Sequence, residues 1–190
     1  MAKTTCKYLT YAKYASGGDG SAVTYTGGKS KLDYLCKVDI GENRSNVKEY
    51  ADGHQIDSEN ALNEVTLALE LAATDADLKK DLLGQTESSS VFTVTGDDAP
   101  FVGVGFVLAE RFKGTTTYEG YWFFKAQFTS GGLTSNTRKE QTQFDHETLN
   151  GSCMGVVQSS GGSVEYYTHK DGMTESAALA WVKGLAGISG

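Results

Sequence analysis

The 190-residue sequence is poor in proline, in histidine and in long apolar runs. Pro100 is the one proline beside 23 glycines, a balance that favours tight turns and β-bulges over a flexible linker. No apolar run approaches the roughly 20 residues that a membrane-spanning helix needs. The N-terminal segment also lacks the apolar core of a secretory signal peptide. We therefore expect synthesis in a cytoplasm and no membrane partner.

The sequence has fewer basic than acidic side chains. It contains 17 Lys and Arg residues and 24 Asp and Glu residues, which gives a formal net charge of -7. Binding to nucleic acid through phosphate neutralisation needs clustered Lys and Arg, so this composition argues against that class of function. Cys6, Cys36 and Cys153 are odd in number and have no metal-ligand spacing. They indicate reduced thiols, and we expect neither a metal nor another cofactor.

The usual signatures of an enzyme are also missing. Residues 103–105, Gly-Val-Gly, lie inside an alternating strand pattern, so they predict close backbone packing and not a dinucleotide loop. His54, His146 and His169 are far apart in sequence, and the neighbours of His146 in Asp145-His146-Glu147 point to the opposite face of a strand. A triad assembled from distant residues stays open. The sequence favours a protein that is not an enzyme.

Alternating apolar and polar residues predict most of the fold. The segments 33–40 and 61–71 each place apolar residues on one face and charged or polar residues on the other, which is typical of antiparallel strands with one wet face. The expected apolar faces are Tyr34, Cys36, Val38 and Ile40 in the first segment, and Val65, Leu67, Leu69 and Leu71 in the second. The segment 137–144 alternates in the same way.

Residues 103–128 predict a hairpin that is apolar on both faces. One face is expected to carry Val104, Phe106 and Leu108 with Trp122, Phe124, Ala126 and Phe128; the other is expected to carry Val107, Tyr121 and Phe123. A hairpin of this kind must be covered twice, by a helix or by another subunit. The helix predicted after Thr174, with Ala178, Trp181, Val182 and Leu185 as its apolar stripe, can supply one cover.

A second, short helix is predicted after residue 74, with Thr74 as its cap, Leu78 and Leu82 on one side and Gly84 at its end. Residues 41–60 are polar without a sustained period, and we expect a long inter-strand loop there. The chain is expected to form one domain over residues 1–190, an α+β, mainly β fold. Its architecture would be an antiparallel β-sandwich or partial barrel flanked by a short helix and a C-terminal helix.

The succession of these features resembles the major tail proteins, or tail tube proteins, of long non-contractile bacteriophage tails. The resemblance is carried by "TGGKSKLDYLCKVDI", "DLLGQT", "APFVGVGFVLAERFKGTTTYEGYWFFKAQF", "TRKEQTQFDHETLNGS" and "TESAALAWVKGLAG". It covers most of the chain. The stretch "FDHETLNG" departs from the family pattern because it lacks an expected proline, and "TTT" lengthens the hairpin turn.

The resemblance implies a structural virion protein that forms hexameric rings, whose inner sheets join into one β-barrel and which stack into a tube for genome ejection. It further implies assembly in the host cytoplasm and a final location in the virion tail. The implied partners are other copies of the chain, a tape measure protein, a tail terminator and tail assembly chaperones. DNA would pass through the tube without specific binding.

Two sets of residues follow as candidates for these roles. The wet faces of segments 33–40 and 61–71 are expected to line the lumen, because a wall that is acidic or neutral does not hold phosphates. The lumen candidates are Asp33, Lys37, Asp39, Glu64, Thr66 and Glu70. The alternative is that the carboxylates among them are exposed on the outer wall. In the segment 41–60, Arg44, Tyr50 and His54 are expected to contact an adjacent subunit or ring.

Two other functions remain open from the residues alone. One is a monomeric β-sandwich that binds carbohydrate or protein with its aromatic residues as a platform. The other is a hydrolase with a triad of scattered residues. An odd number of cysteines and the missing signal peptide weigh against a secreted binding module.

Overall fold

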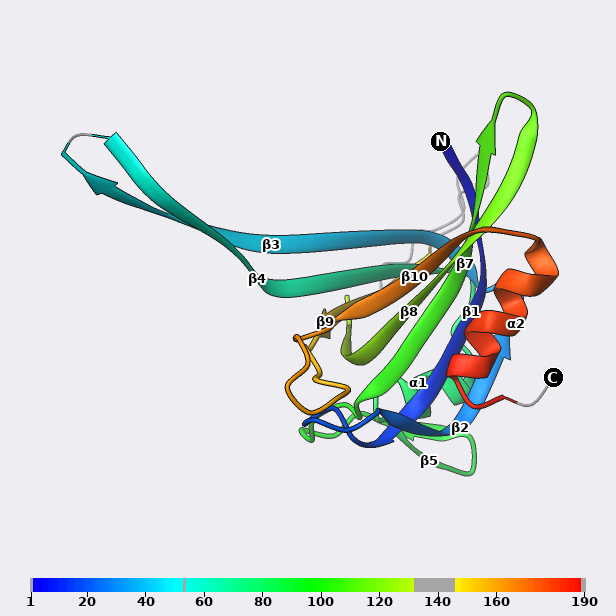
Figure 1. The fold of residues 1–190 in the computed structure, drawn as a ribbon. Coiled ribbons are helices and arrows are strands. Elements are labelled where there is room, and N and C mark those ends of the chain that lie inside the picture. Colours follow the sequence, from blue (N-terminus) through cyan, green and yellow to red (C-terminus); the bar gives the residue numbers. More distant parts are fainter. Residues whose placement is uncertain (1, 53, 132–145, 189–190) are drawn as a thin grey trace, which may run out of the picture.

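The computed structural model describes residues 2–52, 54–131 and 146–188, with ten strands and two helices among them (Figure 1). The strands are β1 (Ala2–Ser16), β2 (Thr24–Lys31), β3 (Leu35–Ala51), β4 (His54–Leu71), β5 (Thr86–Ser88), β6 (Val91–Thr93), β7 (Val102–Phe112), β8 (Thr115–Ser130), β9 (Glu147–Cys153) and β10 (Tyr167–Met173). The helices are α1 (Ala76–Asp81) and α2 (Glu175–Leu185). The alternating segment expected at 137–144 lies outside the described residues.

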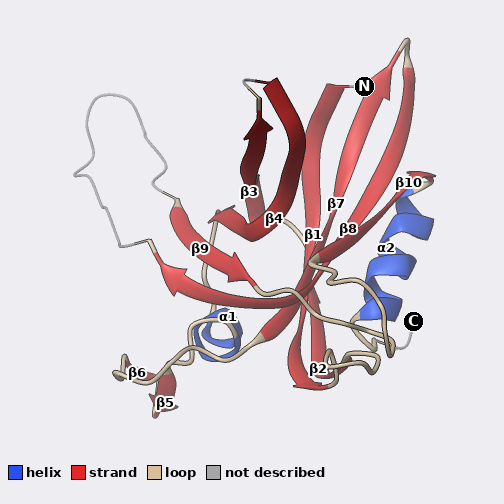
Figure 2. Cartoon of the chain, turned by 60° about the vertical axis from the view of Figure 1, so that its left-hand side comes forward, coloured by secondary structure: helices blue, strands red, loops and turns tan. Residues whose placement is uncertain are grey.

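Eight strands form one antiparallel sheet in the order β2-β1-β7-β8-β9-β4-β3, with β10 paired to β8. The long strand β8 pairs with β10 through its first half and with β9 through its second half. The sheet curls until β1 approaches β3, so that its two halves face each other (Figure 2). The mainly β, α+β class predicted from the alternating segments is confirmed.

The concave side of the curled sheet encloses the larger of two cores, here called the interior core. Its fully buried members come from both halves of the sheet and from α1. They include Leu9, Tyr11, Val65, Leu67, Leu69, Leu71, Leu78, Leu82, Val102, Val104, Phe106, Phe123, Phe128 and Leu149. The alternation of segment 61–71 therefore predicted its buried face correctly.

The outer core lies between α2 and the opposite face of β1, β7 and β8 (Figure 1). It contains Ala12, Val107, Trp122, Phe124, Val156, Ala178, Val182 and Ala186. Thr174 caps α2 by accepting a hydrogen bond from the Ala177 N–H. The hairpin β7–β8 is thus covered on both faces within the chain, by the interior core on one side and by α2 on the other.

The pairing of side chains within that hairpin differs from the sequence prediction. Val104 lies opposite Phe123 and Phe106 lies opposite Tyr121, so these rings share the interior core. Trp122 faces α2. Between the Val102–Ala126 and Val104–Phe123 pairs β8 has one residue more than β7, which is a β-bulge that reverses the alternation. Phe124 therefore faces α2 while Ala126 and Phe128 face the interior core.

Close packing on the α2 side of the hairpin depends on three glycines, as predicted for Gly103 and Gly105. Gly105 and Gly120 approach α2 itself, and Gly103 approaches Tyr25 of β2. A Cβ atom at Gly103 would stand 2.4 Å from the Tyr25 ring, and one at Gly105 would stand 2.6 Å from the Trp122 ring. At Gly120 it would lie 2.8 Å from the Trp181 ring. Any larger side chain at these positions collides with an aromatic ring.

The first turn of α2 is tied to the sheet by Glu175. Its carboxylate accepts hydrogen bonds from Lys7 Nζ and from the Tyr8 hydroxyl, both at 2.8 Å. These bonds and a further one from Tyr118 lower the pKa of Glu175 from 4.5 to about 2. The carboxylate therefore binds its proton less readily in the folded chain than in the unfolded chain.

We expect Glu175→Gln to lower the free energy of unfolding at pH 7 by about 0.5–1 kcal/mol, a small value because the side chain is one third exposed. A depressed folded pKa adds stability above pH 4.5, and this stability is lost as the pH falls toward 2. Urea unfolding between pH 7 and pH 2 measures the difference between the two proteins. A difference that does not shrink below pH 4.5 contradicts this account.

The start of β3 also corrects the sequence prediction. Asp33 has a φ of 61° and lies in the bend before β3, which begins at Leu35, so Asp33 is not part of a wet strand face. The ladder with β4 is irregular between Leu35 and Lys37. Leu35 therefore packs against the interior core, whereas Cys36, expected on the apolar face, is exposed.

Helix α1 begins one residue later than predicted. Asp75, not Thr74, is its cap and accepts a hydrogen bond from the Leu78 N–H. The helix is held against β1 and β2 by ion pairs between its aspartates and three lysines, among them Lys13 to Asp81 at 2.8 Å. Its two leucines belong to the interior core, so α1 covers that part of the core.

Residues 41–60 are not a loop. Residues 41–51 belong to β3 and residues 54–60 to β4; the two strands pair from Leu35–Leu71 to Ala51–His54 and project from the body as one long hairpin (Figure 1). The sequence prediction was wrong because hydrophobic alternation requires one buried face, and most side chains of this ribbon are exposed. We call residues 45–60 the arm.

Candidate assembly and lumen surfaces

The convex side of β3, β4, β9 and the second half of β8 is polar and is called the polar face. Cross-strand partners share a face, so the pairs Lys37–Glu70, Gly41–Thr66 and Thr66–Ser152 define its members. They are Lys37, Asp39, Gly41, Glu64, Thr66, Ala68, Glu70, Gln127, Thr129, Thr148, Asn150 and Ser152. Of the six lumen candidates, five lie together on this face and Asp33 does not.

The contributions of β8 and β9 to the polar face were missed by the sequence analysis. Thr148, Asn150 and Ser152 alternate with Leu149, Gly151 and Cys153, which are mostly buried. This pattern is visible in the sequence, but the position of β9 beside β4 is not. The added residues carry hydroxyl and amide groups, so the centre of the face is neutral.

Pairing further reduces the charge of the polar face. Lys37 Nζ lies 2.5 Å from Asp39 Oδ2, so these two charges offset each other. Glu64 is exposed. The polar face therefore carries mostly neutral polar groups and a weak negative charge.

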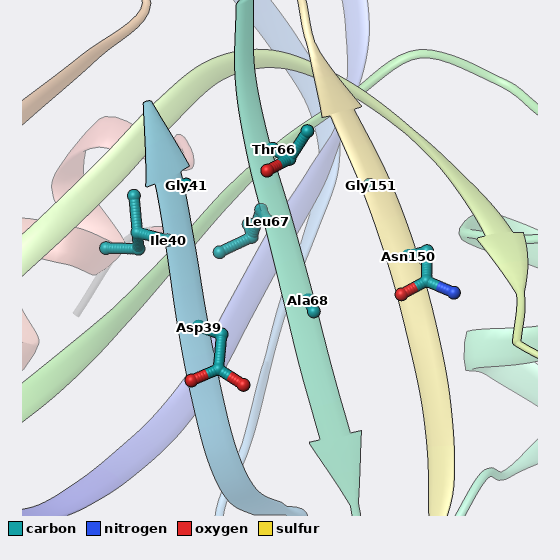
Figure 3. Close-up of a pocket in the computed structure, with 8 residues that line it drawn as sticks. All are labelled: Asp39, Ile40, Gly41, Thr66, Leu67, Ala68, Asn150 and Gly151. Atoms are coloured by element: carbon teal, nitrogen blue, oxygen red, sulfur yellow. The ribbon is translucent and has the colours of Figure 1, made fainter. Parts of the chain in front are cut away.

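A shallow hollow of about 350 Å³ lies on this part of the sheet (Figure 3). Its lining comes from three adjacent strands and comprises Asp39, Ile40, Gly41, Thr66, Leu67, Ala68, Asn150 and Gly151. Asp39, Thr66 and Asn150 supply a carboxylate, a hydroxyl and an amide. The lining contains no histidine, cysteine or lysine, so it provides hydrogen bonds but no nucleophile with a base.

Two tyrosines brace the base of the arm. The Tyr167 hydroxyl donates to Glu42 Oε1 at 2.6 Å, and the Tyr166 hydroxyl lies 3.4 Å from the carbonyl oxygens of Leu62 and Asn63. Arg44 is held by Glu42 at 3.0 Å. Beyond these contacts the two strands of the ribbon continue for about 25 Å, as estimated from the usual rise per strand residue.

The arm exposes several large apolar side chains to solvent. Val47, Tyr50 and Ile56 are 61%, 62% and 52% exposed. A two-stranded ribbon is at best marginally stable alone in water, so burial of these side chains against a partner would stabilise it. Of the predicted contact residues, Tyr50 and His54 lie near the turn and Arg44 lies at the base. Val47 and Ile56 were not among the predicted contact residues.

Strand β3 also has an unpaired edge. Among the described strands, β3 pairs only with β4, which leaves one edge of its 17 residues open. The edge of β2 at the other end of the sheet order is open in the same sense. Unpaired N–H and C=O groups along an edge are a template for a strand from another chain.

The turn between β7 and β8 forms a smaller projection. Phe112 is 55% exposed there, between Arg111 and Lys113. Lys113 and Gly114 have φ values of 47° and 86°, as a tight hairpin turn requires. This tip is available for contact with another chain.

The three histidines do not converge. His54 lies in the arm, His146 pairs with Glu70, and His169 Nδ1 lies 2.7 Å from Glu119 Oε1. Asp145, the residue before His146, lies outside the described residues. Within the described ranges, no three His, Cys, Asp or Glu side chains are placed to share a metal ion.

Glu119 is the most buried carboxylate of these pairs. Its desolvation raises the pKa, but hydrogen bonds from Tyr121 and the charge of Lys3 outweigh this effect, so the pKa is lowered overall. Lys3 Nζ lies 3.3 Å from Glu119 and donates to the Tyr121 hydroxyl at 2.7 Å. This network joins β1, β8 and β10 and is structural.

Neither helix in the described part of the chain has the length and apolar character needed to cross a bilayer. Comparison of the sequence with protein-family models and with curated proteins gave no match.

Proposed function

We propose that the chain is a tail tube protein that assembles into hexameric rings, stacked into a tube through which phage DNA passes. The proposal rests on the sequence resemblance and on one structural observation, the arm. A ribbon with three exposed apolar side chains and no partner in the described chain is well suited to pack against another copy. The tape measure protein, terminator and chaperones remain implied partners.

The open edges of β2 and β3 support association of copies side by side. Pairing of one copy's edge with another copy's edge would extend the sheet, and a closed ring of copies would leave no edge free. Stacking of such rings is a head-to-tail contact, which generates a filament without a fixed length. The arm, which extends well beyond the body, would connect copies within a ring or between rings.

The polar face fits the wall of a conduit. A lumen lined by Lys and Arg would bind phosphates at every ring, whereas hydroxyl, amide and paired charged groups do not hold the DNA. Lys37, the basic residue among the lumen candidates, is paired with Asp39. In this proposal Glu64 and Thr66 on β4 face the DNA.

We expect assembled tubes of the double variant Glu64→Lys and Thr66→Lys to retain duplex DNA, while tubes of the unmodified chain do not. Both side chains are exposed, so the substitutions add positive charge without disturbing the core. Cosedimentation of tubes with DNA measures retention, which should fall steeply as salt increases. Lys substitutions at exposed Val91 and Val164, outside the polar face, serve as the control. Equal retention by both variants contradicts the lumen assignment.

Sedimentation velocity over a series of protein concentrations tests the assembly itself. The proposal predicts that single copies give way to hexamers and larger species as the concentration rises. The alternative of a monomeric binding module predicts one species throughout. The hairpin rings that would form its platform, Phe106, Trp122 and Phe123, are buried, which favours assembly over this alternative.

A further inference from the structure

A thiol, an imidazole and a carboxylate meet at one edge of the polar face. Cys36 comes from the irregular start of β3, Glu70 from β4, and His146 from the residue before β9. His146 Nε2 lies 3.9 Å from Cys36 Sγ, and His146 Nδ1 lies 2.7 Å from Glu70 Oε1. The three groups are thus in line, with the imidazole between sulfur and carboxylate.

The carboxylate determines which nitrogen of His146 carries the proton. An ionised Glu70 accepts hydrogen bonds only, so the Nδ1 atom facing it must be the donor. In a neutral imidazole the other nitrogen, Nε2, is then an acceptor, and it faces the Cys36 thiol. A nucleophile followed by a base and by a group that orients the base is the arrangement that activates weak nucleophiles.

We propose that Cys36 is a base-assisted thiol and a site of modification by small disulfides. His146 acts as the base, and Glu70 is a positioning residue that orients the imidazole and stabilises the imidazolium as it forms. The inference does not depend on tube assembly, because all three residues belong to one chain.

The reaction is a thiol–disulfide exchange. Cys36 Sγ attacks one sulfur of the disulfide, the S–S bond of the reagent breaks, and a new S–S bond joins Cys36 to half of the reagent. The thiol proton passes to His146 Nε2. The departing thiolate takes up this proton when it is a stronger base than imidazole, as with glutathione; a weakly basic thiolate leaves ionised and the proton passes to water. One disulfide is consumed and one is formed, so no further oxidant is needed.

The surroundings make base assistance necessary. Desolvation and then the charge of Glu70 raise the pKa of the Cys36 thiol, so little thiolate exists at neutral pH without a base. The other charged or titratable groups nearby are the Lys37–Asp39 pair on β3, Cys6 on β1 and Glu147 on β9. None of them is the partner of His146 Nδ1.

The other two cysteines are less available than Cys36 for reaction with a disulfide. Cys153 lies in the interior core, where burial raises its pKa to about 12. Cys6 is partly buried, and its thiol is directed to the carbonyl oxygen of Leu35 at 3.8 Å. Cys36 is the exposed thiol of the three.

The test is the rate at which the full-length chain reacts with dithiobis(nitrobenzoate), measured by the release of the coloured thiolate from pH 5 to 9. A Cys6→Ser, Cys153→Ser background isolates Cys36, and mass spectrometry of the unsubstituted chain after treatment with oxidised glutathione shows which of the three cysteines is modified. We expect the rate to rise where imidazoles titrate, between about pH 5 and 8, and then to level off. A rate that instead keeps rising through the ionisation of a thiol overturns the proposal.

Three variants separate base assistance from simple exposure. In His146→Ala the rate at pH 7 should fall at least tenfold and should rise only where the thiol itself ionises. Glu70→Gln should lower the plateau about threefold, because the imidazolium that forms during the reaction loses its counter-charge. His169→Ala, which removes the other histidine paired with a glutamate at 2.7 Å, should leave the rate unchanged. Unchanged kinetics in folded His146→Ala would overturn the proposal.

Discussion

We expect that replacement of residues 46–60 by Asn-Gly abolishes the proposed formation of rings and tubes and leaves the body of the protein folded. Ser45 and Ala61 face each other across the hairpin, so a two-residue turn can join them without a change of register. The two cores contain no residue of the arm. We therefore expect the melting temperature to change by a few degrees at most, while electron micrographs show no assemblies.

A milder variant tests the apolar contact within the arm. Substitution of Val47, Tyr50 and Ile56 by Ser should raise the concentration required for assembly more than about tenfold, which corresponds to about 1.4 kcal/mol per copy. A single buried side chain of this size contributes about 1.5–3 kcal/mol. Val91, Val94 and Val164 are comparably exposed outside the arm, and their substitution by Ser should have no effect. Normal tubes from both arm variants would show that the arm is not an assembly contact.

We expect Gly105→Ala to lower the free energy of unfolding by about 3 kcal/mol, at the upper end of the usual cost of overpacking. A Cβ atom at this position would lie 2.5 Å from the Tyr121 carbonyl oxygen and 2.8 Å from Val182 Cγ1 of α2. The backbone of β8 cannot move away because β10 pairs with it on its other side. The helix must therefore separate from the sheet, or the strands must shift.

Urea unfolding followed by tryptophan fluorescence measures this loss of stability. The signal reports on the interface of α2 and the hairpin, because Trp122 and Trp181 both pack in or against the outer core. Gly184→Ala in α2 is the matched control. No atom lies within 4 Å of a Cβ there, so the substitution should stabilise the helix by about 0.5–1 kcal/mol. If both substitutions change stability by similar amounts, the close approach of α2 to the hairpin is not as described.

The two cores show which structural features the sequence determines by itself. Val65, Leu67, Leu69 and Leu71 alternate without interruption, and all four are fully buried as predicted. The stripe of α2 was likewise predicted, because its helical period and the Thr174 cap agree. Where a local period is regular and one face is buried, sequence and structure agree.

Bulges and partners explain what could not be predicted. Because of one extra residue in β8, Phe124 and Ala126 lie on opposite faces of the sheet instead of the same face. The irregular start of β3 exposes Cys36. Neither leaves a signal in the local sequence. The arm was taken for a loop because its side chains lack the buried face that produces a pattern, and its packing would lie in another copy.

The polar face could be predicted only in part. Its β4 half was predicted from alternation, whereas its β9 half depends on a pairing between residues more than 75 positions apart, such as Glu70 with Thr148. The His146–Glu70 contact depends on that pairing too, since His146 immediately precedes β9. Long-range pairing is set by the whole sheet and not by any short segment.

Electron microscopy of the purified chain at high concentration tests the central claim most directly. The account predicts hollow tubes built of stacked six-membered rings, in which the arm of each copy contacts a neighbouring copy and the polar face lines the lumen. Single copies at every concentration, or assemblies in which the arm remains free in solvent, would contradict it.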